Sequence, residues 1–256
     1  MPPCPAKGIR TTMTEPHDPP PKPRAAALND LSDDALGFGA RELVTARDVL
    51  IRPRQVLEAW MTAGPSGGGR YARPLRLYLA LNAILMLILF LQGGSEAMLP
   101  LIGVDESMFG PLIAESGKSR DAFMADADNW MTLVMVPILS AAYACAATPL
   151  LRWWDPDNLG WRRGFRASFA YLCAMTVPLL PFAWWTFADG PMRLVAAMAL
   201  FVISIAAFMR MGAGRWWRSP FVGLAKALGL SVALQLAGWI GMAPVLAIGL
   251  LAGRFA

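Results

Sequence analysis

The chain has 256 residues, of which 56% are apolar, and its mean hydropathy is +0.44. Both the apolar fraction and the mean hydropathy are higher than in ordinary soluble domains, which predicts a polytopic membrane protein. The formal net charge is +5. Cys4, Cys145 and Cys173 form no CxxC pair, so we expect neither a zinc ribbon nor a disulfide framework, and no metal or other cofactor.

The N-terminal segment 1–39 is rich in proline and poor in apolar residues. Such a composition does not offset the entropy of ordering a chain, so we predict a mostly disordered tail. His17, the one histidine of the sequence, lies in this tail, where we expect it to be solvated.

Residues 40–73 are predicted to form an arm that precedes the first membrane span. Apolar residues, including Leu43, Leu50 and Trp60, recur there at roughly helical spacing, with arginines between them. Pro53 is expected to end one short helix or begin another. A basic helix with an apolar face is typical of the membrane interface, and packing on the cytoplasmic ends of the bundle is a second, compatible interpretation.

The arm ends in a glycine-rich stretch, GPSGGGRYARP, at residues 64–74. A phosphate-binding loop requires a preceding strand and a Lys-Ser/Thr pair, and this stretch has neither. We therefore interpret it as a flexible hinge that leads into the membrane. A second Walker-like stretch, SGKS at 116–119, has Leu112 where that loop requires glycine, so we attribute it to chance.

Residues 74–256 are predicted to form an all-α bundle of five transmembrane helices. The expected spans are 75–92, 130–151, 167–187, 192–209 and 222–250, with an outer loop at 93–129. Pro178 and Pro181 are expected to bend the third span. The fifth is too long for one perpendicular crossing, so it is expected to tilt, to start in the interface, or to bend near Pro244.

Basic residues give an orientation. They concentrate in 1–76, 152–166 and 210–220, which predicts a cytoplasmic N-terminus and an external C-terminus. Tryptophans at the expected span ends agree with this orientation. The residues expected to anchor the protein to anionic headgroups at the inner edge are Arg52, Arg54, Trp60, Arg70, Arg73, Arg76, Trp153, Trp154, Trp216 and Trp217.

The predicted spans contain no Asp or Glu, which argues against proton-coupled or cation-coupled transport. Asn82 and Gln235 are interpreted as hydrogen-bonding groups between helices. Small residues recur every fourth position of the last span, a pattern that lets another helix approach closely. This row consists of Ala225, Gly229, Ala233, Ala237 and Gly241, and its partner is left open between this chain and another subunit.

The run Arg52-Pro53-x-x-Val56, then Arg70-Tyr71, then Pro74 just before a span, resembles an uncharacterised bacterial family of multi-pass inner-membrane proteins. That resemblance implies a bacterial inner-membrane location. More distantly, the five-span layout with a cytoplasmic N-terminus is similar to the Yip family of membrane-organising proteins.

Three functions follow as hypotheses. The first is a non-enzymatic organiser of lipids or membrane partners, without nucleic-acid binding, whose partner is a second copy or another membrane protein. The alternative is a transporter or channel for a neutral or anionic solute, which the bent third span suggests. The third is an enzyme with its site in the outer loop. A polar cavity midway across the bundle favours transport, and a tightly packed interior favours the organiser.

Overall fold

A computed structural model describes residues 39–94, 109–157, 159–186 and 191–255. The regular elements over these residues are helices, in the order α2 (Ala40–Ile51), α3 (Pro53–Thr62), α4 (Pro74–Leu91), α5 (Gly110–Ser116), α6 (Arg120–Trp154), α7 (Trp161–Leu179), η3 (Leu180–Phe182), α8 (Ala183–Thr186), α9 (Pro191–Gly212) and α10 (Pro220–Phe255). The predicted disorder of the tail, with His17, and residues 95–108 of the predicted outer loop lie outside the described residues.

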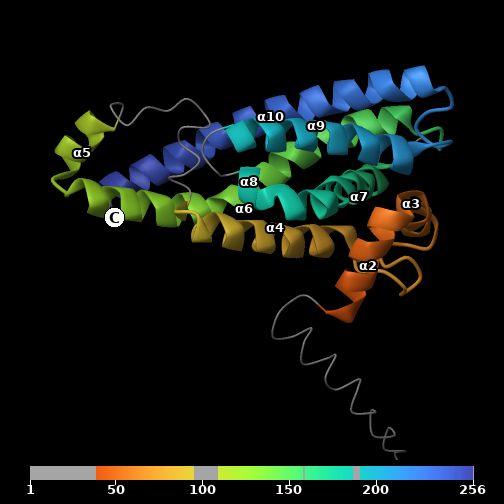
Figure 1. Ribbon diagram of the computed structural model, residues 1–256, viewed down its shortest axis with the longest axis horizontal. Coiled ribbons are helices and arrows are strands. Elements are labelled where there is room, and N and C mark those ends of the chain that lie inside the picture. The colour runs from red at the N-terminus through yellow and green to blue at the C-terminus, as the bar shows by residue number, and fades with distance from the viewer. Residues whose placement is uncertain (1–38, 95–108, 158, 187–190, 256) are drawn as a thin grey trace, which may run out of the picture.

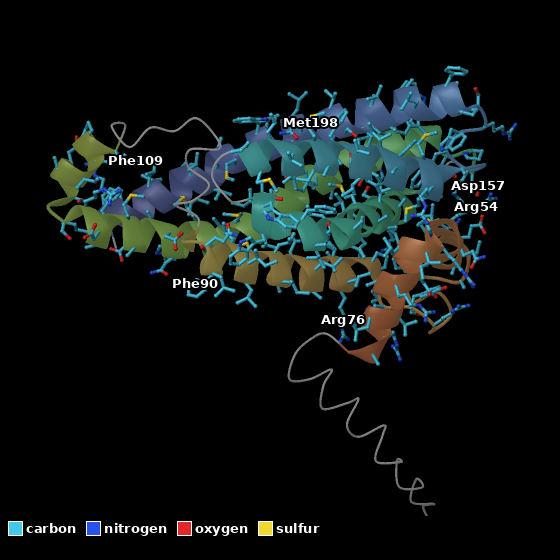
Figure 2. The ribbon with its side chains drawn as sticks, in the orientation of Figure 1. Arg54, Arg76, Phe90, Phe109, Asp157 and Met198 are labelled. Carbon is cyan, nitrogen blue, oxygen red and sulfur yellow. The ribbon has the colours of Figure 1, made fainter. Side chains whose placement is uncertain are left out.

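Five helical segments are long and apolar enough to cross a membrane, which confirms the predicted number of spans. They are 74–91, 120–154, 161–186, 194–212 and 220–255. Large apolar side chains such as Phe90 and Met198 project outward from these helices (Figure 2), as expected of surfaces that face lipid. The chain is therefore a multi-pass helical membrane protein by architecture.

The bundle has two distinct ends (Figure 1). The helices α2 and α3 lie at one end, which we name the arm end. The short helix α5 and the C-terminal end of α10 lie at the other, which we name the loop end. The arm and the end of α10 thus sit at opposite ends of the bundle, as an odd number of crossings requires.

The helix α6 begins ten residues before the predicted span, so the prediction of an outer loop at 93–129 is wrong for 120–129. Ser119 caps the helix by accepting a hydrogen bond from the Ala122 amide at 3.3 Å. Its aspartates lower the hydropathy of the first turns, but Phe123 is buried there against α5 and α10. The segment is an amphipathic helix. An average of hydropathy over such a segment is low and does not distinguish it from a loop.

The last span is one helix of 36 residues that contains Pro244. At about 1.5 Å per residue it is ~54 Å long, well beyond the ~30 Å of a bilayer core. It pairs with α6 along much of its length. Both helices continue past the other spans at the loop end (Figure 1), where α5 packs against them.

The third span is the centre of the bundle. Its most apolar window is 56% buried, against 28–33% for the other four spans, and α7 packs against α4, α6, α9 and both arm helices. The α-helix ends at Leu179 and continues as the 3-10 turn η3 and then α8. This interruption follows Pro178 and includes Pro181, in agreement with the predicted break in helical hydrogen bonding.

The small-residue row of α10 does not make one continuous contact within the chain. Ala237 and Gly241 are buried and Ala233 is partly buried, but Ala225 and Gly229 face outward. A Cβ atom on Gly241 would lie 3.0 Å from the side chains of Ala142 and Leu139, whereas one on Gly229 would meet nothing within 4 Å. Packing at Ala225 and Gly229 stays a prediction that requires another subunit.

The glycines that bring α10 and α6 together are found further along the helix. A side chain on Gly249 would strike Met131 and come within 3.1 Å of the Ala127 carbonyl oxygen, and one on Gly253 would lie 3.0 Å from the Phe123 carbonyl oxygen. Gly241, Val245, Gly249 and Gly253 are four residues apart, so they follow one face of the helix.

We predict that Gly249→Leu lowers the free energy of unfolding in detergent by about 1–3 kcal/mol, because the new side chain must displace α6. Gly229→Leu is the matched control, and it is expected to leave the thermal midpoint of the monomer close to that of the wild type. Equal midpoints for both variants would contradict the contact between α6 and α10 described above.

Candidate functional site

The arm helix α2 buries three polar residues together with Val49, and exposes four large apolar residues together with Arg41 and Arg47. Glu42, Thr45 and Asp48 are buried. Leu43 and Ile51 on the opposite face are 59% and 56% exposed, and Val44 and Leu50 are exposed beside them. A helix that faces water usually exposes its polar residues, so the exposed apolar residues of α2 make it a candidate contact surface.

The buried polar groups of α2 bind the segment that leads into α4. Glu42 accepts a hydrogen bond from the Gly39 amide at 3.0 Å and pairs with Arg76 Nε at 2.8 Å. Thr45 Oγ1 accepts from the Ala72 amide at 2.9 Å. A buried carboxylate is costly without such partners, so these contacts fix the arm against the first span.

Asp48 makes the corresponding contacts one turn later. Arg47 Nη2 lies 3.0 Å from its Oδ1, and Arg70 Nη2 and the Tyr71 hydroxyl each donate to its Oδ2 at 3.4 Å. Burial by itself raises the pKa of this carboxyl group. The hydrogen bond from Arg47 and the charges of Arg47 and Arg70 outweigh burial and hold the pKa below its usual value of 3.8.

The prediction that Trp60 anchors the arm in the membrane interface is wrong. Its side chain is 0% exposed, and its Nε1 donates to the Ala72 carbonyl at 3.1 Å. The hydrogen-bonding groups of Ala72 are therefore held from two sides, by Thr45 of α2 and by Trp60 of α3. Tyr71 packs edge-on against Trp60, with ring centroids 6.3 Å apart.

Arginines of the bundle cap the two arm helices. Arg210 of α9 donates to the carbonyl of Ile51, the last residue of α2, at 3.1 Å. Arg166 of α7 donates to the Trp60 carbonyl in the last turn of α3 at 2.6 Å. Neither arm helix has a basic residue in its own last turn, so the bundle supplies the positive charge that a helix C-terminus favours.

The glycine stretch is a series of hydrogen-bonded turns, which corrects the prediction of a flexible hinge. Gly64, Gly67, Gly68 and Gly69 all have positive φ, between 54° and 90°, a region that other residues rarely adopt. The Gly68 amide donates to Ala63 at 3.1 Å, and the Tyr71 amide donates to Ser66 at 3.0 Å. These amides are used within the loop, in keeping with the interpretation that it is not a phosphate-binding loop.

The predicted anchoring arginines divide into two groups. Arg54 pairs with Glu58 at 2.9 Å, and Arg70 and Arg76 pair with the buried carboxylates of α2 as described above. Arg52 and Arg73 are exposed and have no carboxylate partner in the described part of the chain. Within the described ranges, the guanidinium groups of Arg52 and Arg73 therefore make no ion pair with another part of the chain.

The sequence contains Arg-Trp-Trp twice, at 152–154 and at 215–217, and the two stretches meet at the arm end. Arg215 of the second stretch binds Asp155, directly after the first, with Nε–Oδ2 2.5 Å and Nη2–Oδ1 3.1 Å, and it also reaches Asp157 at 2.9 Å. Trp153 is 83% exposed, in keeping with an interfacial position, and Trp154 and Trp217 are partly buried. Trp216 is 1% exposed and stacks on Phe208 at 5.4 Å, so its predicted role as an interface anchor is wrong.

Polar side chains within the spans bond either to one another or to backbone carbonyl groups. The Thr148 and Ser168 hydroxyls are 2.9 Å apart, Ser204 and Ser231 are 2.8 Å apart, and Tyr171 donates to the Ser204 carbonyl at 3.2 Å. Asn82 donates to Tyr78 of its own helix at 2.9 Å, and Gln235 faces outward, so neither makes the predicted interhelical bond. The hydroxyl pairs fill that role, and their short side chains gave no distinctive sequence signal.

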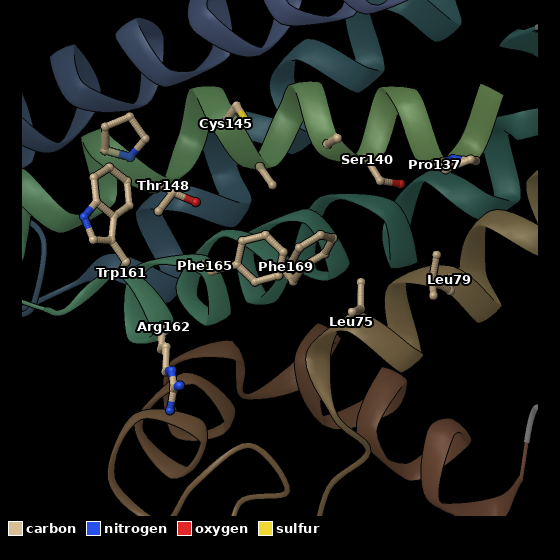
Figure 3. Close-up of a pocket in the computed structure, with 13 residues that line it drawn as sticks. Leu75, Leu79, Pro137, Ser140, Cys145, Thr148, Trp161, Arg162, Phe165 and Phe169 are labelled. Carbon is tan, nitrogen blue, oxygen red and sulfur yellow. The ribbon is translucent and has the colours of Figure 1, made fainter. Parts of the chain in front are cut away.

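A groove of about 870 Å³ opens on the side of the bundle between α4, α6 and α7 (Figure 3). Phe165 and Phe169 of α7 lie along it, Trp161 lies at one end, and Leu75 and Leu79 of α4 lie towards the other end. Its lining is almost entirely apolar. Among the described residues there is no cluster of three or more His, Cys, Asp or Glu able to hold a metal ion.

Comparison of the chain with protein-family models, with curated protein sequences and with solved structures finds no match. The candidate site is therefore defined by its own geometry: the arm helix α2 with its exposed apolar residues, the exposed arginines at the arm end, and the apolar groove beside them.

We predict that the arm loosens as the pH falls below about 3.8. A carboxyl group whose pKa is lowered in the folded state stabilises that state above its unfolded pKa, and this contribution is lost as the pH falls through the folded value. Hydrogen exchange at the Tyr71 and Ala72 amides in detergent, corrected for intrinsic rates, reports the loosening. The Asp48→Asn variant should lack the share of this pH-dependent increase in exchange that comes from protonation of Asp48. A pH profile equal to that of the wild type would contradict the assignment.

Proposed function

We propose that this chain is a non-enzymatic, multi-pass protein of the bacterial inner membrane that organises lipids or membrane partners at its arm end. The observation that carries the proposal is the outward apolar face of α2, held rigidly beside the membrane-crossing helices. The acidic residues of α2 are buried, and its exposed residues are four large apolar residues together with Arg41 and Arg47, a combination found in interfacial helices. The partner class remains an anionic lipid surface, a second copy of the chain or another membrane protein.

The rigidity of the arm supports an organising role over a passive tether. The arm helices are capped by Arg166 and Arg210 from the bundle, and the chain between arm and bundle is fixed at Ala72. A surface held in a fixed geometry loses little conformational entropy when it binds, which favours a scaffold. The distribution of basic residues supports a cytoplasmic location of the arm end.

The alternative of a transporter or channel gains less support from the described residues. Transport of a polar solute requires convergent polar groups on a path through the bundle. The interhelical hydroxyls of Thr148, Ser168, Ser204 and Ser231 bond in pairs, and the large groove lies on the side of the bundle with an apolar lining. This arrangement fits the packed interior expected of an organiser.

The test is crosslinking of the full chain in intact membranes, followed by identification of the recovered proteins and lipids. We predict that Leu43→Asp strongly reduces recovery of the specific partners, because it places a charge in the outward apolar face of α2. Gln55→Asp is the matched control, since it adds the same charge to an exposed position in the first turn of α3 and should leave recovery unchanged.

Recovery that is identical in the wild type and in Leu43→Asp would overturn the role of α2. Flux of a neutral or anionic solute in proteoliposomes of the purified chain, absent from protein-free vesicles, would instead establish the transport alternative.

A further inference from the structure

The groove between α4, α6 and α7 exists because α4 packs mainly on α7 and makes little contact with α6. The α6 residues that face the gap are small and leave it unfilled. They include Ser140 and Ala144, which are one helical turn apart, and Ala141 and Cys145, which are also one turn apart. The groove is thus a feature of helix packing that the side chains of the described residues do not close.

The length of the groove matches one leaflet of a bilayer. Its α6 wall runs from Pro137 to Pro149, a rise of about 18 Å at ~1.5 Å per residue. Half of a bilayer core is about 15 Å thick. The groove starts at the arm end, where Trp161 and Arg162 begin α7, and continues inward along both phenylalanines (Figure 3). It therefore covers the depth of the acyl region of the leaflet on the arm side.

The lining requires no polar ligand. The Ser140 hydroxyl donates to the Val136 carbonyl of its own helix, and the Thr148 hydroxyl is shared with Ser168. The rest of the lining consists of leucine, phenylalanine, proline and alanine side chains with Cys145, and of Trp161 and Arg162 at the arm end. An occupant that fills this space gains dispersion contacts along its length, and a hydrocarbon chain makes them without leaving a polar group unsatisfied.

The start of α7, at the arm end of the groove, is positively charged. The Arg162 side chain extends from there towards the arm (Figure 3), and Arg163 lies next to it outside the groove lining. Arg162 and Arg163 are exposed in the first turn of α7 and have no carboxylate partner in the described ranges. Gly160 precedes the helix and offers no side-chain cap. Arg152 lies 4.2 Å from the Trp161 ring centroid and donates to the Leu159 carbonyl at 2.6 Å, which holds the tryptophan at this end of the groove. An anionic headgroup complements this arrangement.

We propose that the groove binds one acyl chain of an anionic phospholipid from the arm-side leaflet, with the lipid phosphate at Arg162 and Arg163. The lipid lies with its chain along Phe165 and Phe169 and its headgroup at the start of α7. This inference deepens the proposed function, since it gives a lipid class and a place for the lipid beside the arm.

The test uses the full chain in nanodiscs that contain phosphatidylglycerol with a photoactivatable group in one acyl chain, with labelled residues mapped by mass spectrometry. We expect labelling concentrated on the α6 wall between Pro137 and Pro149 and on α7 near Phe165. Ala141→Phe fills the groove from an exposed position and should reduce this labelling several-fold. Ala206→Phe, on an exposed face of α9, is the matched control and should leave it unchanged.

A second arm of the experiment tests the headgroup. The same probe with a phosphatidylcholine headgroup should label the groove less, and Arg162→Gln with Arg163→Gln should remove the difference between the two probes. Cys145→Phe is an independent groove-filling variant, and the thermal midpoint of every variant shows whether its fold is retained.

Labelling spread evenly over all outward apolar faces and insensitive to Ala141→Phe would overturn the proposal. Equal labelling by both headgroups in the wild type would overturn the phosphate site, and crosslinking of Cys145 to another chain in place of lipid would assign the groove to a protein. We expect Leu43→Asp, which tests the arm surface, to leave the labelling of the groove unchanged. The two proposals can therefore fail independently of each other.

Discussion

The burial of Glu42 and Asp48 on the inner face of α2 constrains the arrangement of the whole arm end. A carboxylate that leaves water must find charged or hydrogen-bonding partners, and those of α2 include Arg76 and Arg70, which flank the entry to the first span. Once these pairs form, α2 has a fixed rotation about its own axis. The apolar residues Leu43 and Ile51 are then directed outward, and the glycine turns take up the chain between the arm and α4.

The central helix α7 connects this arm to the rest of the bundle. Its first turns carry Arg162 and Arg163 at the arm end of the groove and Arg166 beneath α3, so three nearby arginines serve two different surfaces. The helix α4 packs along α7 and makes little contact with α6, so α7 also forms one side of the groove. The arm surface and the groove are therefore neighbouring features that share one structural element.

The two Arg-Trp-Trp stretches differ in how much of their environment could be predicted from the local sequence. Interfacial physics explained why both stretches occur at span ends, and it agrees with the exposure of Trp153. It did not anticipate that Arg215 would clamp Asp155, or that Trp216 would stack on Phe208 inside the bundle. Residues of the same type at equivalent chain positions thus have opposite environments, because their neighbours come from different helices.

The sequence by itself determined the number of spans, the helical class, the break after Pro178 and the two-helix arm. Each of these depends on hydropathy, periodicity or proline within about twenty consecutive residues, and the physics that decides them is local. Only the tertiary structure decided which face of α2 is buried, that Trp60 is internal, that the glycine stretch is ordered, and that a groove opens beside α7. These features depend on partners such as Ala72, Arg166 and Arg210, contributed by other segments of the chain, and no local pattern specifies which helix a given side chain will meet.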